Sequence, residues 1–153
     1  MVIWRLCRRR YSRRPLDGEG ARFYGGRWNY PGTVVVYTAG TLALAALEVL
    51  VHVDLDLVPT DLVSIPIKIP TGIRIEEISV AVLPANWRNT PAPERLQELG
   101  TTWVRRGTSL LLQVPSTVIP EEHNYLVNPA HPDLPRLKSG APKLFTFDPR
   151  LFK

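Results

Sequence analysis

The sequence contains a single cysteine, Cys7, among its 153 residues. One cysteine excludes an internal disulfide framework, and the absence of CxxC and HExxH spacings leaves no indication of a metal site. Long apolar runs are also missing, because the longest, residues 41–51, falls short of the roughly 18 residues that a membrane span needs. We therefore expect a protein of a reducing cytoplasm that is neither exported nor inserted into a membrane.

Acidic side chains are fewer than basic ones. Lysine and arginine number 19 against 14 aspartates and glutamates, which gives a formal net charge of +5 and a pI near 9.7. This excess favours an anionic partner, either nucleic acid, an acidic protein or a phosphorylated small molecule, without choosing among them. The 44% hydrophobic and 22% charged fractions are typical of a soluble globular chain, and we predict one domain over residues 1–153.

Strand and helix patterns alternate along the chain. The β-branched segments 2–6, 33–38 and 64–69 are predicted strands, as are residues 109–114, 125–127 and 144–147. Apolar residues at helical spacing predict a helix over 41–51 with Thr41 as N-cap, and a second helix is predicted over 93–103. Residues 84–93 contain three prolines and are expected to form a surface loop. The mixture predicts an α+β fold, a mixed sheet with few helices.

One carboxylate interrupts the apolar helix. Glu48 is the only ionisable residue between Leu42 and Val51. A helix that is apolar on nearly every face is usually buried on nearly every face, and an unpaired buried carboxylate is costly. Glu48 should then shift its pKa, pair with a cation or face a polar cavity. Alternatively, it lies on the one solvent-facing edge of the helix.

Arg27 and Tyr37, which precede Glu48 in the sequence, are candidate partners of this carboxylate. Arg27 follows Gly26 in a loop whose glycines allow a close approach to a ligand, and its guanidinium suits a carboxylate or a phosphate. It can equally be a surface arginine in a turn. Tyr37 ends a predicted strand, where its ring either opens onto the space that Glu48 faces or belongs to the core.

The segment VPSTVIPEEHNYLVNPAHPD carries an unusual density of polar residues between prolines. Ser116 lacks a GxSxG environment, so it does not read as an acyl-transfer nucleophile. Asn124 and Asn128 flank a predicted strand. His123 and His131 are most simply surface or hydrogen-bonding residues, since a metal pair needs a third ligand that the sequence does not supply. Residues 70–107 carry no motif with a functional interpretation.

These residues together resemble the RES domain family, found in bacterial toxins of RES–Xre toxin–antitoxin pairs. The resemblance rests on GARFYGGRWNYPGTVVVYTAGTLALAALE with Arg27, Tyr37 and Glu48, on Ser116 in VPS, and on NYLVNPAHPD. Order and spacing agree over nearly the whole chain.

The resemblance implies a cytoplasmic toxin that destroys NAD by cleaving the nicotinamide–ribose bond, with a fold distantly similar to that of ADP-ribosyltransferase toxins. NAD would be the substrate, no other cofactor is implied, and the acceptor would be water or inorganic phosphate. The implied partner is an Xre-like antitoxin with a helix-turn-helix, which obstructs the NAD pocket and provides the only route to DNA. A homodimer is compatible with the sequence but has no signature in it.

The resemblance also assigns roles to individual residues. Glu48 would stabilise the oxocarbenium-like ribose left by the departing nicotinamide or hold a ribose hydroxyl. Arg27 would bind the pyrophosphate or an acceptor phosphate through a bidentate contact. Tyr37 would flank the nicotinamide ring.

Three further residues receive supporting roles from the same resemblance. Ser116 would position a ribose hydroxyl, a phosphate or the attacking acceptor, and Asn124 or Asn128 would support the same pocket. ADP-ribosyltransferases usually carry their catalytic glutamate late in the chain, so the fold analogy supports the chemistry only loosely.

Two other functions stay open at this point. The same site could transfer ADP-ribose to a protein. Alternatively, residues 7–15, CRRRYSRRP, place five arginines beside a tyrosine and could bind nucleic acid, although no helix-turn-helix, zinc-finger or RRM signature accompanies them.

Overall fold

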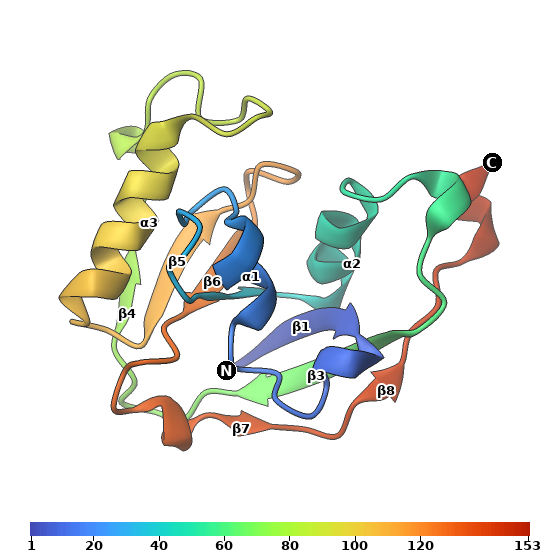
Figure 1. Ribbon diagram of the computed structural model, residues 1–153, viewed down its shortest axis with the longest axis horizontal. Coiled ribbons are helices and arrows are strands. Elements are labelled where there is room, and N and C mark those ends of the chain that lie inside the picture. Colours follow the sequence, from blue (N-terminus) through green and yellow to red (C-terminus); the bar gives the residue numbers. More distant parts are fainter.

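A curled mixed sheet organises the chain, for which the computed structural model describes residues 1–153 (Figure 1). Its strands are β1 Val2–Arg8, β2 Val36–Ala39, β3 Leu62–Lys68, β4 Ile75–Glu77, β5 Leu111–Pro115, β6 His123–Val127, β7 Lys138–Ser139 and β8 Lys143–Leu144. They run in the order β4-β5-β6-β2-β1-β3-β7, with β8 also paired to β3. Only β4 and β5 are parallel.

Three α-helices accompany the sheet: α1 Glu19–Tyr24, α2 Leu42–Leu50 and α3 Glu94–Arg106. Figure 1 shows α3 beside β4 and β5 and α2 beside β1, with α1 between them. The sheet with few helices confirms the predicted α+β fold. No helix combines the length and the apolar character that a membrane crossing requires.

The predicted elements are present with shifted ends. The Thr41 hydroxyl caps α2 by accepting from the Leu44 amide at 3.0 Å, and β3 is confirmed over most of its predicted length. The strand predicted at 33–38 begins only at Val36. The strand predicted at 144–147 is wrong beyond Leu144. The sequence missed α1, β4 and β7, because these elements are too short to show a period.

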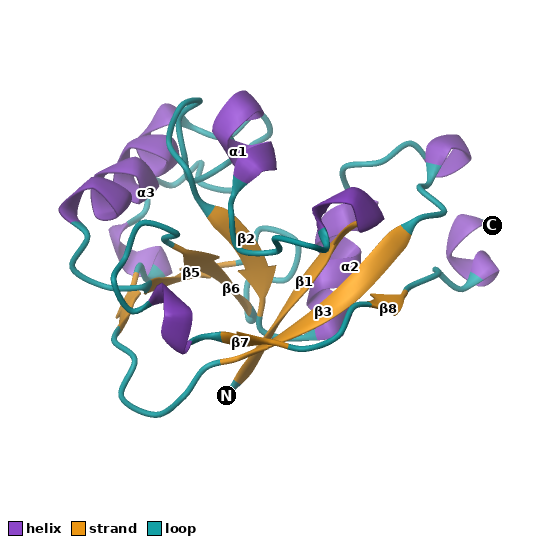
Figure 2. Cartoon of the chain, turned by 60° about the horizontal axis from the view of Figure 1, so that its bottom comes forward, coloured by secondary structure: helices purple, strands orange, loops and turns teal.

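Side-chain alternation gives the sheet two apolar faces. On β5, Leu111 points into one core cluster with Ile3 and Ile65, whereas Leu112 packs in another cluster with Trp103 of α3. This period of two is what a strand covered on both faces requires. In Figure 2, β1 and β3 lie side by side as the longest strands, with β7 and β8 along β3.

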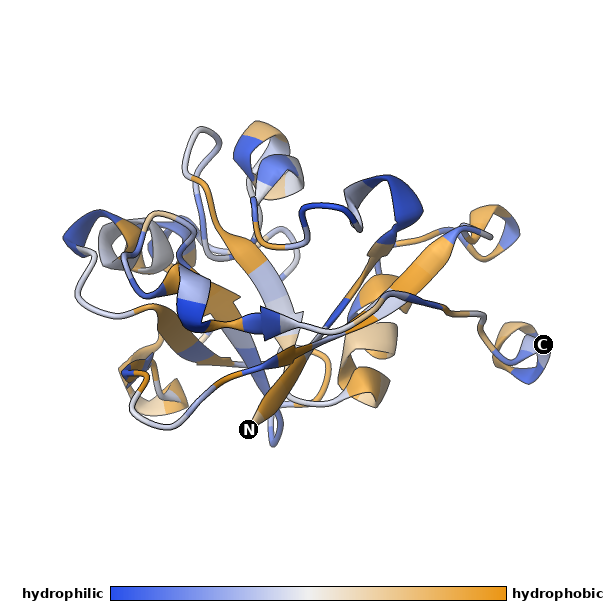
Figure 3. Cartoon of the chain, turned by 90° about the horizontal axis from the view of Figure 1, so that it is seen from below, coloured by the Kyte–Doolittle hydropathy of each residue, from blue (hydrophilic) through white to orange (hydrophobic).

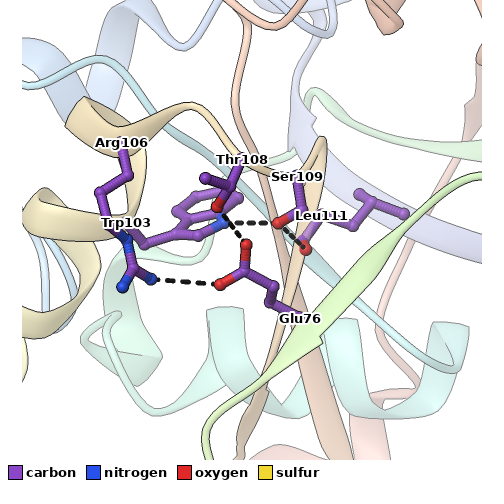
Figure 4. A network of polar contacts seen from close by, with 6 residues as sticks. All are labelled: Glu76, Trp103, Arg106, Thr108, Ser109 and Leu111. Atoms are coloured by element: carbon purple, nitrogen blue, oxygen red, sulfur yellow. Dashed lines mark hydrogen bonds and ion pairs between the residues drawn. The ribbon is translucent and has the colours of Figure 1, made fainter.

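The C-terminal end of α3 is fastened to the sheet by a polar network (Figure 4). Trp103 donates its indole N–H to the hydroxyl of the fully buried Ser109 at 2.8 Å. The carboxylate of Glu76 on β4 accepts from the Thr108 hydroxyl and pairs with Arg106 at 3.1 Å. The Thr108 hydrogen bond is the main cause that lowers the pKa of Glu76.

Helix α2 is covered on one face only, which contradicts the expectation of burial on nearly every face. Leu44 and Ala45 are buried in a small cluster against the sheet, while Ala43 is exposed and Val51 is 57% exposed. The reason is topological, because the chain supplies no second layer over the outer face of α2. Figure 3 shows the orange α2 on one side of β1 and β3 and the blue segment Arg9–Tyr11 on the other.

Candidate functional site

A cavity of about 710 Å³ brings together four residues that the sequence singled out, and we call it the polar cavity. Arg27 reaches it from the loop after α1, Tyr37 from β2, Glu48 from α2 and Asn124 from β6. The register explains part of this grouping: Ala39 pairs with Asn124, and side chains two apart on β2 share a face, so Asn124 and Tyr37 lie on the same side of the sheet.

Two neutral donors hold the carboxylate of Glu48. Its Oε1 accepts a hydrogen bond from Ser116 Oγ at 2.7 Å and another from Asn124 Nδ2 at 2.6 Å. Its Oε2 accepts none from the protein, and Glu48 takes part in no ion pair, including with Arg27. Of the alternatives for Glu48, the structure supports a half-buried carboxylate that faces a cavity. One oxygen is fixed and the other is free.

Ser116 lies behind Glu48 and not in the cavity wall. The residue is 0% exposed, and its hydroxyl donates to Glu48 while it accepts from the amides of Val118 and Ile119 at 3.1 Å each. Every hydrogen-bonding position of this hydroxyl is therefore occupied. The expected contact of Ser116 with substrate or acceptor does not agree with this burial. The geometry instead makes Ser116 a positioning residue for Glu48.

Arg27 is held by the loop that the sequence analysis left without a function. Its Nη1 donates to the carbonyls of Trp87 and Asn89 at 3.0 Å each, and its Nη2 donates to Thr90 Oγ1 at 3.4 Å. Burial lowers the pKa of Arg27, and the charge of Glu48 opposes this effect. Only Nε and one Nη2 hydrogen stay free of the protein. Any bidentate ligand contact must use this edge of the guanidinium.

The hydroxyl of Tyr37 fixes the loop that carries Arg27. It donates to Asn29 Oδ1 at 2.6 Å and accepts from the Trp28 amide at 3.0 Å. Burial raises the pKa of Tyr37 far above its ordinary value, so the phenol stays neutral. A Cβ on Gly26 would meet this hydroxyl at 2.6 Å, which explains the glycine. The ring of Tyr37 lines the cavity while its polar end is occupied in the loop.

Helix α3 supports the same loop from behind, through residues that sequence reasoning missed. Gln97 Nε2 donates to the Gly26 carbonyl at 3.1 Å, and the Thr101 hydroxyl accepts from the Tyr30 amide at 3.0 Å. Gly100 lies between these contacts, where a Cβ would approach the Trp28 carbonyl oxygen to 1.8 Å. The available signal was the placement of Gln97, Gly100 and Thr101 on adjoining positions of one predicted helix.

His52 is a cavity residue that the sequence analysis did not consider. It lines the polar cavity with Glu48 from the turn after α2, four residues further along the chain. That i, i+4 spacing was the signal that could have revealed it. His52 is exposed, and only its backbone amide is hydrogen-bonded, to the Val49 carbonyl at 3.1 Å, so its imidazole is free to meet a ligand.

Asn128 does not reach the cavity, in contrast to the expectation. It follows the end of β6 opposite to Asn124 and is 1% exposed. Its amide donates to the Val104 carbonyl at 3.2 Å and accepts from the Ala130 amide at 3.0 Å. These two hydrogen bonds join the turn after β6 to α3. No group of three histidine, cysteine, aspartate or glutamate side chains is arranged to hold a metal ion.

The basic segment lies apart from this cavity. Arg8, Arg9 and Arg10 are exposed, and none of them lines the cavity wall. Arg8 pairs with Asp61 at 2.7 Å. Nucleic-acid binding by this segment stays a prediction, independent of the site around Glu48.

Comparison with known proteins shows which family the chain resembles. The RES domain model matches residues 2–148. Toxin Res of Yersinia enterocolitica is 40% identical over 157 residues, with 99% of each chain covered. The Prs ADP-ribosylating toxin of a Sphingobium species is 36% identical over 155 residues, covering 99% of this chain and 96% of that protein.

A solved structure shows the same fold. The M. tuberculosis MbcT–MbcA toxin–antitoxin complex contains a chain that matches with a TM-score of 0.75 at 18% identity, covering 99% of this chain and 86% of that one. At that identity the likeness concerns the fold alone. The family match extends over nearly the whole chain, and the full-length relatives agree with it. The chain therefore belongs to the RES domain family.

Proposed function

We propose that this protein is a toxin that depletes NAD by cleaving the bond between nicotinamide and ribose. The observation that carries the proposal is Glu48, whose Oε1 is fixed by Ser116 and Asn124 while its Oε2 is free at the cavity wall. The names of the relatives support a toxin, and one of them is named an ADP-ribosylating toxin. ADP-ribosylation and NAD cleavage begin with the same bond.

The chemistry follows from where charge develops. As the glycosidic C1′–N bond breaks, its electron pair goes to the pyridine nitrogen, and the ribose becomes oxocarbenium-like. A preorganised carboxylate in a partly desolvated site stabilises such a cation more strongly than water does. Glu48 Oε2 is the group for this task. Fixing Oε1 spares the enzyme the reorganisation of the carboxylate during the reaction.

Arg27 is the group for the pyrophosphate. Its Nε and one Nη2 hydrogen are free, and these two donors form an edge suited to two phosphate oxygens. Because its other edge is bound to the loop at residues 87–90, the guanidinium is already oriented before a ligand arrives. The net charge of +5 would assist the approach of an anionic dinucleotide.

The acceptor distinguishes three outcomes of the same first step. Attack by water on C1′ gives ADP-ribose and releases a proton, whereas attack by inorganic phosphate gives ADP-ribose 1-phosphate. Attack by a protein side chain gives an ADP-ribosylated protein, and the name of the Sphingobium relative favours this as the second candidate. NAD labelled in its adenine separates them: label retained on protein supports transfer, and free ADP-ribose or its 1-phosphate supports degradation.

The deciding experiment is NAD consumption by the purified protein, with and without inorganic phosphate and with product identification. Glu48→Gln keeps the size of the side chain and removes its charge, so we expect a rate loss of at least about 100-fold. Glu121→Gln, at an exposed position outside the cavity, is the matched control and should keep the wild-type rate. Folded wild-type protein that leaves NAD intact would contradict the proposal.

An Xre-like antitoxin in the cytoplasm is the partner we propose, with obstruction of the polar cavity as the mode of inhibition. The support is the fold shared with a chain of a toxin–antitoxin complex. Co-expression with the antitoxin should restore growth, and the purified complex should degrade NAD more slowly than the free toxin. Equal rates for the two would exclude obstruction.

A further inference from the structure

A second cavity, of about 320 Å³, adjoins the polar cavity at Glu48, and we call it the apolar chamber. The two spaces share four wall residues, which are Tyr37, Glu48, His52 and Asn124. The rest of the chamber wall comes from β1, β2, α2 and the turn after α2 and is mostly hydrophobic: Trp4, Leu6, Thr38, Ala39, Ala45, Val49 and Val53. Glu48 therefore stands on the boundary between a polar and an apolar space.

Charge is distributed unequally across this boundary. Arg27 lines the polar cavity and is absent from the wall of the chamber, where Glu48 is the only carboxylate and His52 the only basic side chain. A ligand that extends over Glu48 would thus place its phosphates on the side of Arg27. The part on the other side must be uncharged, or carry a positive charge delocalised over a ring, and must be flat enough to fit among apolar side chains.

We propose that the apolar chamber is the subsite for the leaving base, and that it takes an aromatic carboxamide such as nicotinamide. This inference rests on the proposed cleavage of NAD. When the C1′–N bond breaks at Glu48, the cationic pyridinium takes up the bonding electron pair and leaves as a neutral ring. Apolar walls favour that neutral product over the charged ring, so the chamber assists departure.

The shared wall also has unused hydrogen-bonding capacity for the carboxamide. Asn124 Oδ1 is buried without a partner, although Asn124 Nδ2 is bound to Glu48. A carboxamide N–H donated to this oxygen would satisfy it once the side chain adjusts to the ligand. The imidazole of His52, which has no partner in the protein, is the second polar group within the chamber wall. An adenine ring could fill the same volume, and the test below separates the two bases.

The test uses a substitution that narrows the chamber and measures how strongly the product nicotinamide inhibits NAD cleavage. Val49→Phe places an aromatic ring in the wall, whereas Val51→Phe makes the same change at a 57% exposed position that lines neither cavity. We expect Val49→Phe to weaken inhibition of NAD cleavage by nicotinamide at least about tenfold while inhibition by AMP stays within twofold. Val51→Phe should change neither.

Direct binding makes the outcome independent of turnover. Nicotinamide alone is titrated against wild type and both variants by ligand-observed NMR, with thermal unfolding to show that each is folded. If wild type binds nicotinamide and Val49→Phe does not, the subsite stands even if NAD is never cleaved, and only the proposed function fails. Wild type that does not bind nicotinamide, or a folded Val49→Phe with unchanged binding, overturns the subsite. If Val49→Phe weakened inhibition by AMP alone, the chamber would be assigned to adenine, and the nicotinamide subsite would likewise be overturned.

Should Val49→Phe fail to fold, Trp4→Ala tests the same wall from β1. Trp4 is half-buried and lines the chamber only. Removing its ring enlarges the chamber, so nicotinamide inhibition should weaken at least about fivefold without a matching change for AMP. Unchanged nicotinamide inhibition in folded Trp4→Ala would count against the subsite.

Discussion

The hydroxyl of Ser116 lies 2.7 Å from Glu48 Oε1, with its residue completely buried behind the carboxylate. Ser116 Oγ also accepts hydrogen bonds from the backbone amides of Val118 and Ile119. This one atom therefore links the turn after β5 to the carboxylate on α2. A serine in this place orients a charge. It has no exposed face for a substrate.

Ser116→Ala should therefore damage both catalysis and stability. The change removes one of two donors to Glu48 and leaves two partly buried amides without their acceptor, which costs about 2–3 kcal/mol of unfolding free energy. We expect kcat for NAD cleavage to fall more than about tenfold with a smaller change in KM. Urea unfolding and initial rates measure the two effects.

The matched control for this variant is Ser109→Ala. Ser109 is equally buried, and its hydroxyl joins Trp103 to a backbone carbonyl far from Glu48 (Figure 4). Its loss should lower stability to a similar extent and leave kcat within about twofold. If both variants lost kcat alike, the effect of Ser116 would be attributable to stability alone.

Arg27→Lys tests whether the loop contacts of the guanidinium matter. A single ammonium cannot reach the carbonyls of Trp87 and Asn89 while it also offers two donors to a phosphate, so we expect KM for NAD to rise about tenfold or more. Arg88→Lys is the control. Arg88 lies in the same loop, donates to the Thr117 carbonyl and lines neither cavity. A KM within twofold of wild type for Arg27→Lys would exclude the phosphate role.

The sequence predicted what depends on local pattern. Thr41 and the apolar positions after it defined α2, and β-branched runs defined β1 and β3, because capping and periodicity act within a few residues. The same pattern led to an error, since it cannot show whether a second layer covers the helix. The exposed Ala43 shows that the outer face of α2 is not covered in this chain.

The sequence predicted which residues form the site better than it predicted how they are arranged. The resemblance selected Arg27, Tyr37 and Glu48, and all three line the cavity. It could not tell that Ser116 supports Glu48 from behind, because that depends on a turn geometry with no signature. Nor could it place Asn128, which comes directly after β6, whereas Asn124 lies within the strand near its start.

Gly100→Ala should loosen the support of the Arg27 loop. The new Cβ would lie 1.8 Å from the Trp28 carbonyl oxygen, a backbone atom that cannot move aside, so α3 must shift away from the loop. We expect a loss of about 3 kcal/mol in unfolding free energy. Gly20→Ala in α1 is the control, because no heavy atom lies within 4 Å of its new Cβ, and it should be neutral or slightly stabilising. Equal stabilities of the two variants would contradict the close packing.

Glu76 gives a pH signature for the anchoring of α3. The Thr108 hydrogen bond, followed by smaller effects that include Arg106, lowers the pKa of Glu76 in the folded protein. A lowered folded pKa adds stability above the unfolded value of about 4.3, and this gain is lost as pH falls through the folded pKa. Urea unfolding should thus show wild type more stable than Glu76→Gln at pH 7, with the difference shrinking below about pH 4. Glu77→Gln is the control, because this side chain is exposed on the same strand and makes no hydrogen bond or ion pair, and it should change the unfolding free energy at pH 7 much less. A difference for Glu76→Gln that stays constant from pH 7 to pH 3 would mean that the charge does not hold the helix.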